Sequence, residues 1–151
     1  MNKYKVDYQK ILEGRNKCSG FLRTVGFRVT DIGHLYAKAE IELGEQHNNP
    51  MGSTHGGVTF TMADTVGGVC ANTMGMTTVT INGDIHFLNA AINCKRLIGE
   101  ATPVKVGKRI AVIQVMITDD TGKEIAMATM TYQFCPNIPF PFQDALIAIE
   151  D

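Results

Sequence analysis

Residues 49–64 read NPMGSTHGGVTFTMAD, and this stretch sets where the longest helix begins and what it carries. A polar loop leads into His55-Gly56-Gly57, and an apolar run with a single carboxylate, Asp64, follows at once. Apolar residues continue to Thr73 and are spread around the helix, which is typical of a helix covered on several sides. We therefore predict a central helix over Gly57–Thr73 that contains a buried aspartate.

The segments on both sides of this helix alternate apolar and polar residues, as half-buried antiparallel strands do. The alternation is clearest in HLYAKAEIEL, residues 34–43, which we expect to pair with Phe21–Thr30 through a turn at Asp31-Ile32-Gly33. Further strands are predicted over residues 77–88, 95–105, 109–118 and 124–134, with turns at Val106-Gly107-Lys108 and Asp119–Gly122. One helix against five to six antiparallel strands is an α+β architecture.

The two ends of the chain lie outside this pattern. Val6–Glu13 is predicted to form a short helix that ends at Gly14, within an N-terminal helical segment of residues 1–20. The tail, residues 136–151, is rich in proline, so it is expected to start extended and to end as a short helix or disordered. With 151 residues, the chain is expected to be a single domain, residues 1–151.

Composition excludes several classes of protein. A net charge of −1 argues against a nucleic-acid partner, and no apolar run is long enough to span a membrane. The N-terminus has no signal-peptide core, and the four cysteines form no CxxC pair that would predict a zinc site or a disulfide framework. We expect a cytoplasmic protein with reduced thiols and no metal.

The pattern N-x-x-G-x-x-H-G-G-x-x-x-x-x-x-D, from Asn49 to Asp64 and followed by a strand meander, resembles the hotdog-fold acyl-CoA thioesterases. Within that superfamily, which includes the 4-hydroxybenzoyl-CoA thioesterases, it is most similar to the PaaI-like (phenylacetate-pathway) group. The resemblance extends from about Phe21 to Phe134 and implies a hotdog fold, a long central helix wrapped by an antiparallel sheet. It also implies an acyl-CoA substrate, no cofactor beyond the coenzyme A of that substrate, and active sites at a dimer interface.

The two glycines at the helix start have a chemical interpretation. The first turn of a helix has unpaired N–H groups and the positive end of the dipole, so Gly56 and Gly57 are predicted to let a thioester carbonyl approach and be polarised. The alternative is that they only allow a tight loop-to-helix turn.

The distance between Gly56 and Asp64 predicts a homodimer. Eight residues at 1.5 Å each separate the two by about 12 Å along one helix, whereas reacting groups must approach to about 3 Å. If both act in one site, they come from different subunits, giving two equivalent composite sites. Dimers are further expected to pair as a dimer of dimers, a homotetramer. The alternative for Asp64 is a structural bond to a nearby hydroxyl.

The remaining candidate residues are assigned from the resemblance and from their positions. Asn49 and Thr80 match positions that hold the substrate carbonyl or orient water in similar enzymes, although a turn before Pro50 and strand propensity explain them as well. His55 is a predicted substrate-binding residue, although a role in positioning the loop is favoured. The other predicted substrate-binding residues are Thr61 and Gly68, on the helix near Asp64, and Lys108 and Arg109, which either meet the coenzyme A phosphates or form an exposed basic turn.

The predicted function is hydrolysis of an aryl or medium- to long-chain acyl-CoA, with Asp64 of the partner subunit as general base or nucleophile. A non-catalytic acyl-CoA binding or sensing domain is the alternative. A hotdog hydratase or dehydratase would need a histidine–carboxylate pair, and no histidine partner for Asp64 is apparent in the sequence. Serine-hydrolase chemistry is disfavoured because no GxSxG motif is present.

Overall fold

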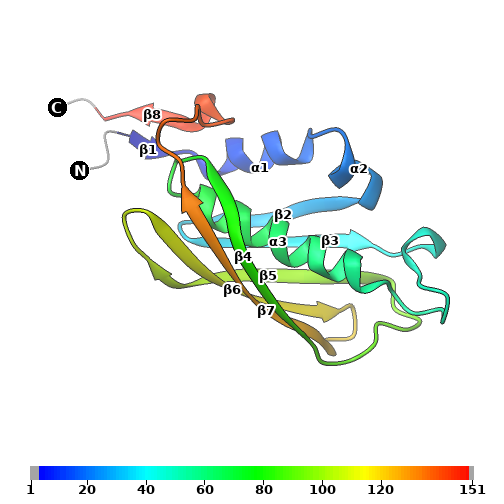
Figure 1. Cartoon of the computed structure of the whole chain (residues 1–151). Coiled ribbons are helices and arrows are strands. Elements are labelled where there is room, and N and C mark those ends of the chain that lie inside the picture. The colour runs from blue at the N-terminus through cyan, green and yellow to red at the C-terminus, as the bar shows by residue number, and fades with distance from the viewer. Residues whose placement is uncertain (1–3, 150–151) are drawn as a thin grey trace.

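One six-stranded antiparallel sheet curves around a long helix in the computed structural model, which describes residues 4–149 (Figure 1). The strands lie in the spatial order β2-β3-β5-β6-β7-β4, so β2 and β4 are the edge strands. Their bounds are Phe27–Gly33 (β2), Tyr36–Glu42 (β3), Thr78–Phe87 (β4), Arg96–Val106 (β5), Ile110–Asp119 (β6) and Glu124–Phe134 (β7). The four strands predicted after the helix are therefore confirmed, with shifts of a residue or so at their ends.

The helix α3, Gly56–Asn72, lies along the concave face of the sheet (Figure 1). Its inward side chains, such as Met62 and Val66, are fully buried in the main core. Where α3 crosses β5 the strand has Gly99, and a Cβ there would lie 2.7 Å from the sulfur of Met62, so glycine permits the close packing. This arrangement confirms the predicted α+β architecture. Within residues 4–149, no helix is both long and apolar enough to cross a membrane.

The first helix, α1, spans Tyr8–Asn16 and starts later than the predicted Val6–Glu13. The side chain of Asp7 accepts a hydrogen bond from the Lys10 backbone N–H (3.3 Å) and so fixes the first turn. The helix does not end at Gly14 as predicted but continues to Asn16. A Cβ at Gly14 would lie 2.5 Å from a ring carbon of Phe142, so only glycine fits beneath that ring.

Two predictions about the first hairpin are wrong. Residues Phe21–Val25 form a short helix, α2, and only the second half of the predicted strand Phe21–Thr30 belongs to β2. Gly26, with φ of 85°, ends α2 in the left-handed conformation that glycine favours. The predicted turn at residues 31–33 instead belongs to β2, because a bulge after Val29 accommodates Asp31 within the strand. The reversal falls at His34 and Leu35.

The tail folds back onto the N-terminal segment. After a 3₁₀ turn at Gln143–Ala145, strand β8, Leu146–Ala148, pairs antiparallel with β1, Tyr4–Val6. The expectation of a short terminal helix or disorder is therefore wrong for these residues, whereas 150 and 151 lie outside the described range. A small second core cluster joins the two ends through Ile11, Phe140, Phe142 and Ala145.

Candidate functional site

The start of α3 leaves one amide without a partner. His55 caps the helix, and its ring Nδ1 accepts a hydrogen bond from the Gly57 N–H at 2.8 Å. The Val58 N–H donates to the His55 carbonyl at 2.9 Å. Within residues 4–149, the Gly56 N–H has no hydrogen-bond partner. Of the two predicted glycine amides, Gly57 is therefore already bonded, and Gly56 is the one that can receive an oxygen.

Gly56 lines a pocket of about 350 Å³ with mainly apolar walls, which we call the amide half-site. Phe87, Leu88 and Ile125 contribute to the walls, together with the chain around residues 89–91. A Cβ on Gly56 would lie 3.3 Å from the Phe87 ring, so a larger side chain would fill the space in front of the amide. This geometry gives glycine a role at the helix start.

Asp64 lies two turns further along α3 and is half-buried, whereas a buried aspartate was predicted. Its carboxylate Oδ1 accepts a hydrogen bond from the Thr80 hydroxyl of β4 at 2.7 Å. The two line a second pocket, of about 180 Å³, which we call the carboxylate half-site. The structure thus brings together Asp64 and Thr80, two of the predicted catalytic residues, and within residues 4–149 Oδ2 has no hydrogen-bond partner.

Tyr132 of β7 supports this part of the helix, and the sequence analysis did not identify it. Its hydroxyl donates to the Asp64 backbone carbonyl at 2.6 Å, and burial, followed by the nearby Asp64 carboxylate, raises the pKa of that hydroxyl. The tyrosine therefore remains a protonated donor. A Cβ on Gly67 would overlap the Tyr132 hydroxyl, so this glycine makes room for the tyrosine and not for a ligand. Gly68, a predicted substrate-binding residue, has ordinary clearance and lines the carboxylate half-site.

The remaining predicted site residues lie elsewhere on the same face or in loops. The Asn49 side chain is occupied within its loop, where it accepts from the Met51 N–H (2.9 Å) and donates to the Ser53 hydroxyl (2.8 Å). Thr61 lies between the half-sites and donates to the Gly57 carbonyl at 2.8 Å. Lys108 and Arg109 form the turn between β5 and β6, outside the lining of both half-sites among residues 4–149.

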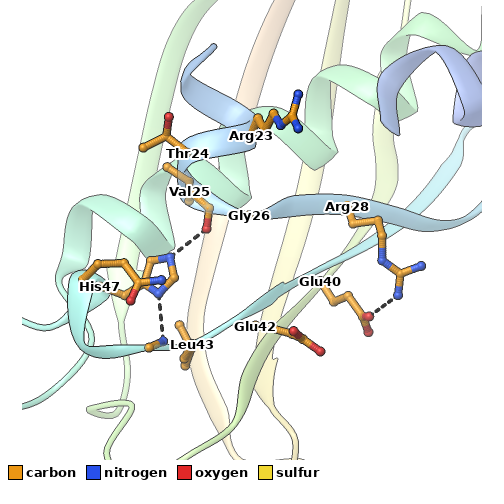
Figure 2. Close-up of a pocket in the computed structure, with 11 residues that line it drawn as sticks. Arg23, Thr24, Val25, Gly26, Arg28, Glu40, Glu42, Leu43 and His47 are labelled. Atoms are coloured by element: carbon orange, nitrogen blue, oxygen red, sulfur yellow. Dashed lines mark hydrogen bonds and ion pairs between the residues drawn. The ribbon is translucent and has the colours of Figure 1, made fainter. Parts of the chain in front are cut away.

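A larger hollow of about 490 Å³ lies beside the start of β2 and the end of β3 (Figure 2). Its histidine, His47, uses both ring nitrogens: Nδ1 accepts from the Gly44 N–H at 3.0 Å, and Nε2 lies 2.7 Å from the Val25 carbonyl. Arg28 forms an ion pair with Glu40 in the same region. The His47 contact attaches the loop before α3 to the end of α2, and the ion pair joins β2 to β3, so we place the candidate site on α3 and not in this hollow.

The two half-sites belong to different stretches of one helix. Gly56 and Asp64 are eight residues apart, which is about 12 Å along the axis. Neither half-site alone combines a free amide with a carboxylate. One subunit therefore presents the free amide and the carboxylate at two separate places along α3.

The chain is similar in sequence to known proteins. The model of the thioesterase superfamily matches residues 51–126, half of the chain. Human acyl-coenzyme A thioesterase 13 is 27% identical over 128 residues, which cover 82% of this chain and 91% of that protein.

Solved structures share the fold. A Haemophilus influenzae thioesterase superposes with a TM-score of 0.80 at 22% identity, over 91% of this chain and 97% of the other. The Escherichia coli PaaI protein of the phenylacetic acid degradation operon superposes with a TM-score of 0.78 at 21% identity, over 85% of this chain and 95% of that protein. A Streptococcus mutans protein bound to acetyl CoA superposes with a TM-score of 0.72 at 23% identity, over 80% of this chain and 94% of that protein. The chain therefore belongs to the thioesterase superfamily and is a thioester-hydrolysing enzyme with a hotdog fold.

Proposed function

We propose that this protein hydrolyses acyl-CoA thioesters to a free acid and coenzyme A, in a homodimer whose two sites each combine Gly56 of one subunit with Asp64 of the other. The observation that carries this proposal is the separation of the free amide from the Asp64 carboxylate by about 12 Å on one helix. The acyl-CoA class is supported by the name of the human relative and by the acetyl CoA bound to the Streptococcus mutans protein.

The exposed edge of β4 supports the dimer. Within residues 4–149, its outer side has no strand partner, because β4 pairs only with β7. Val79, Ile81 and Phe87 are 43%, 49% and 58% exposed along this strand, and Phe60 of α3 lies exposed beside it. A free, apolar edge is a template for another strand. Pairing β4 with β4 of a second copy would bring the two α3 helices together about a two-fold axis.

In the composite site, each residue has a distinct role. The Gly56 N–H and the positive end of the helix dipole would polarise the thioester carbonyl and stabilise the oxyanion that develops on it. Thr80 holds Oδ1 of Asp64, so Oδ2 is the oxygen left to react. By one route Oδ2 removes a proton from water while the water oxygen adds to the carbonyl carbon. The carbon–sulfur bond then breaks, and the coenzyme A thiolate leaves and takes up a proton.

A second route uses Asp64 as the nucleophile. Oδ2 then attacks the carbonyl carbon itself, coenzyme A leaves, and water hydrolyses the resulting mixed anhydride to restore the carboxylate. Both routes need an ionised Asp64 and consume one water for each thioester. The acyl group that we propose is aryl or medium- to long-chain aliphatic.

The test is thiol release from a panel of aryl and aliphatic acyl-CoAs, comparing wild type with Asp64→Asn. We expect turnover to fall at least about a hundredfold, because the amide can act neither as base nor as nucleophile. Asp144→Asn, an exposed carboxylate in the tail, is the matched control and should leave turnover unchanged. If the folded wild type binds these thioesters and cleaves none, the protein is a binding domain and the proposal is wrong.

A further inference from the structure

A cation from outside the hotdog core lines the carboxylate half-site. Arg15, in the last turn of α1, forms part of this pocket together with Leu22 of α2, Asp64 and Thr80. Both α1 and α2 precede the sheet in the chain. The pocket wall opposite Asp64 is therefore built by the N-terminal segment, which the family match at residues 51–126 does not include.

The guanidinium of Arg15 has donors that the protein leaves unused. Nη2 donates to the Asn72 side-chain carbonyl, and the group lies 5.3 Å from the centre of the Phe142 ring. Nε is buried and has no hydrogen-bond partner within residues 4–149. No carboxylate of these residues lies within ion-pair distance of Arg15. Because arginine stays charged in proteins, the pocket wall holds a desolvated positive charge without a counter-ion.

The rest of the carboxylate half-site is polar as well. Hydroxyl-bearing Thr65 and Thr78 line it beside Thr80, and Leu22 is its one aliphatic side chain beyond glycine. Thr80 donates to Asp64 and Thr78 accepts from the Asn72 side chain, so these two hydroxyls already have partners. A plain alkyl chain would leave the free donors of the guanidinium unpaired, which is unfavourable once water is excluded. An acyl group with its own hydrogen-bond acceptors would pair with them.

The contacts of Arg15 to Asn72 and Phe142 are consistent with a purely structural role, but they do not neutralise its charge. They instead fix the direction of a planar donor group, which suits recognition of a carboxylate. Asn72 lies eight residues after Asp64, about 12 Å along α3. A ligand group held by Arg15 would therefore lie several bonds away from a carbonyl held near Asp64.

We propose that Arg15 is a specificity-determining residue that binds a carboxylate at the far end of the acyl chain, so that the favoured substrates are mono-CoA thioesters of dicarboxylic acids. This inference rests on the proposed thioesterase function and narrows its substrate class. The same subunit supplies Asp64 and Arg15, and the positive charge of Arg15 offsets the repulsion between Asp64 and an anionic acyl group.

The experiment compares kcat/KM for pairs of thioesters of equal chain length, hexanoyl-CoA against adipoyl-CoA and octanoyl-CoA against suberoyl-CoA. Wild type is expected to prefer the carboxyl-terminated member of a pair. Arg15→Met should reduce that preference about ten- to a hundredfold, the range for a charged hydrogen bond, and leave methyl-terminated substrates nearly unaffected. Arg23→Met, at an exposed arginine of α2 outside both half-sites, removes the same charge and should change nothing.

The outcomes separate this inference from the proposed function. If wild type cleaves neither member of any pair, nor the aryl panel, the thioesterase proposal itself fails. If wild type has the same kcat/KM for methyl-terminated thioesters and their carboxyl-terminated partners, only the role of Arg15 is wrong, whether or not the variants fold. An equal loss of kcat/KM for both members of a pair in Arg15→Met also overturns the role of Arg15. Such a loss would show a structural or electrostatic effect on Asp64. Arg15→Lys keeps the charge and should retain part of the preference.

Discussion

Gly67 and Gly68 are adjacent in α3, yet a methyl group would meet different surroundings at each. At Gly67 it would overlap the hydroxyl of the buried Tyr132, whereas at Gly68 the nearest atom is a ring carbon of that tyrosine at 3.5 Å. We predict that Gly67→Ala destabilises the protein by about 1 to 3 kcal/mol, because overpacking outweighs the helix propensity of alanine. Gly68→Ala should instead stabilise it, by about 0.5 to 1 kcal/mol.

Urea unfolding followed by circular dichroism measures both variants, and each serves as the other's control. The two changes add the same atoms to the same helix, so a difference in sign must come from Tyr132. If both variants shift the free energy of unfolding in the same direction, the packing of Tyr132 against Gly67 is not as described.

At the scale of single elements, the turn between β6 and β7 depends on one carboxylate. Asp119 accepts from the Thr121 hydroxyl (2.6 Å) and from the backbone N–H groups of Thr121 (2.8 Å) and Lys123 (3.1 Å). The Thr121 hydroxyl, supported by these N–H groups against the opposing effect of burial, lowers the pKa of Asp119 below 3.8. The bonds therefore add stability above pH 3.8, and that stability is lost as the pH falls through the lower pKa of the folded state.

We predict that Asp119→Asn lowers the free energy of unfolding by about 1 kcal/mol at neutral pH. The difference from wild type should shrink as the pH falls below 3.8, because both side chains are then neutral. Denaturant titrations at a series of pH values measure it, with Asp144→Asn as the control. A difference that stays constant with pH would contradict the assignment.

How far the sequence leads depends on whether a feature is local. The helix start, Asp64 and the strands after it were predictable because their signals are contained in short stretches: a glycine pair, a lone carboxylate, and alternation such as that of Glu124–Phe134. Tyr132 and Arg15 were not, because their proximity to Asp64 depends on how β7 and α1 pack against α3. Residues 21–25 were mistaken for a strand because five residues show no clear period, and the glycines at 20 and 26 alone delimit the helix.

At the scale of the whole molecule, composite sites make a quantitative prediction about mixed dimers. Gly56→Val blocks the amide half-site, and Asp64→Asn disables the carboxylate half-site, so each homodimer should be inactive. In a heterodimer one site carries both defects and the other carries neither. Random pairing of equal amounts should therefore restore about a quarter of wild-type activity, since half of the dimers are mixed and one of their two sites is intact.

Co-expression with two affinity tags, followed by purification on both, isolates the mixed dimer, which should have about half of wild-type activity because one of its two sites is intact. If each site lay within one subunit, every site would carry a defect and activity would stay at the background of the single variants. Light scattering on the same samples reports whether the variants still associate.

The antiparallel pairing of β1 with β8 also bears on the order in which the chain acquires its pocket. Arg15 leaves the ribosome early, in α1, whereas Phe142, the ring against which its guanidinium rests, follows only after all six strands of the main sheet. A nascent chain that has completed β7 already contains Asp64, Thr80 and Tyr132, but not the tail that encloses α1. The ring against which the guanidinium rests is thus synthesised after every residue that lines the carboxylate half-site.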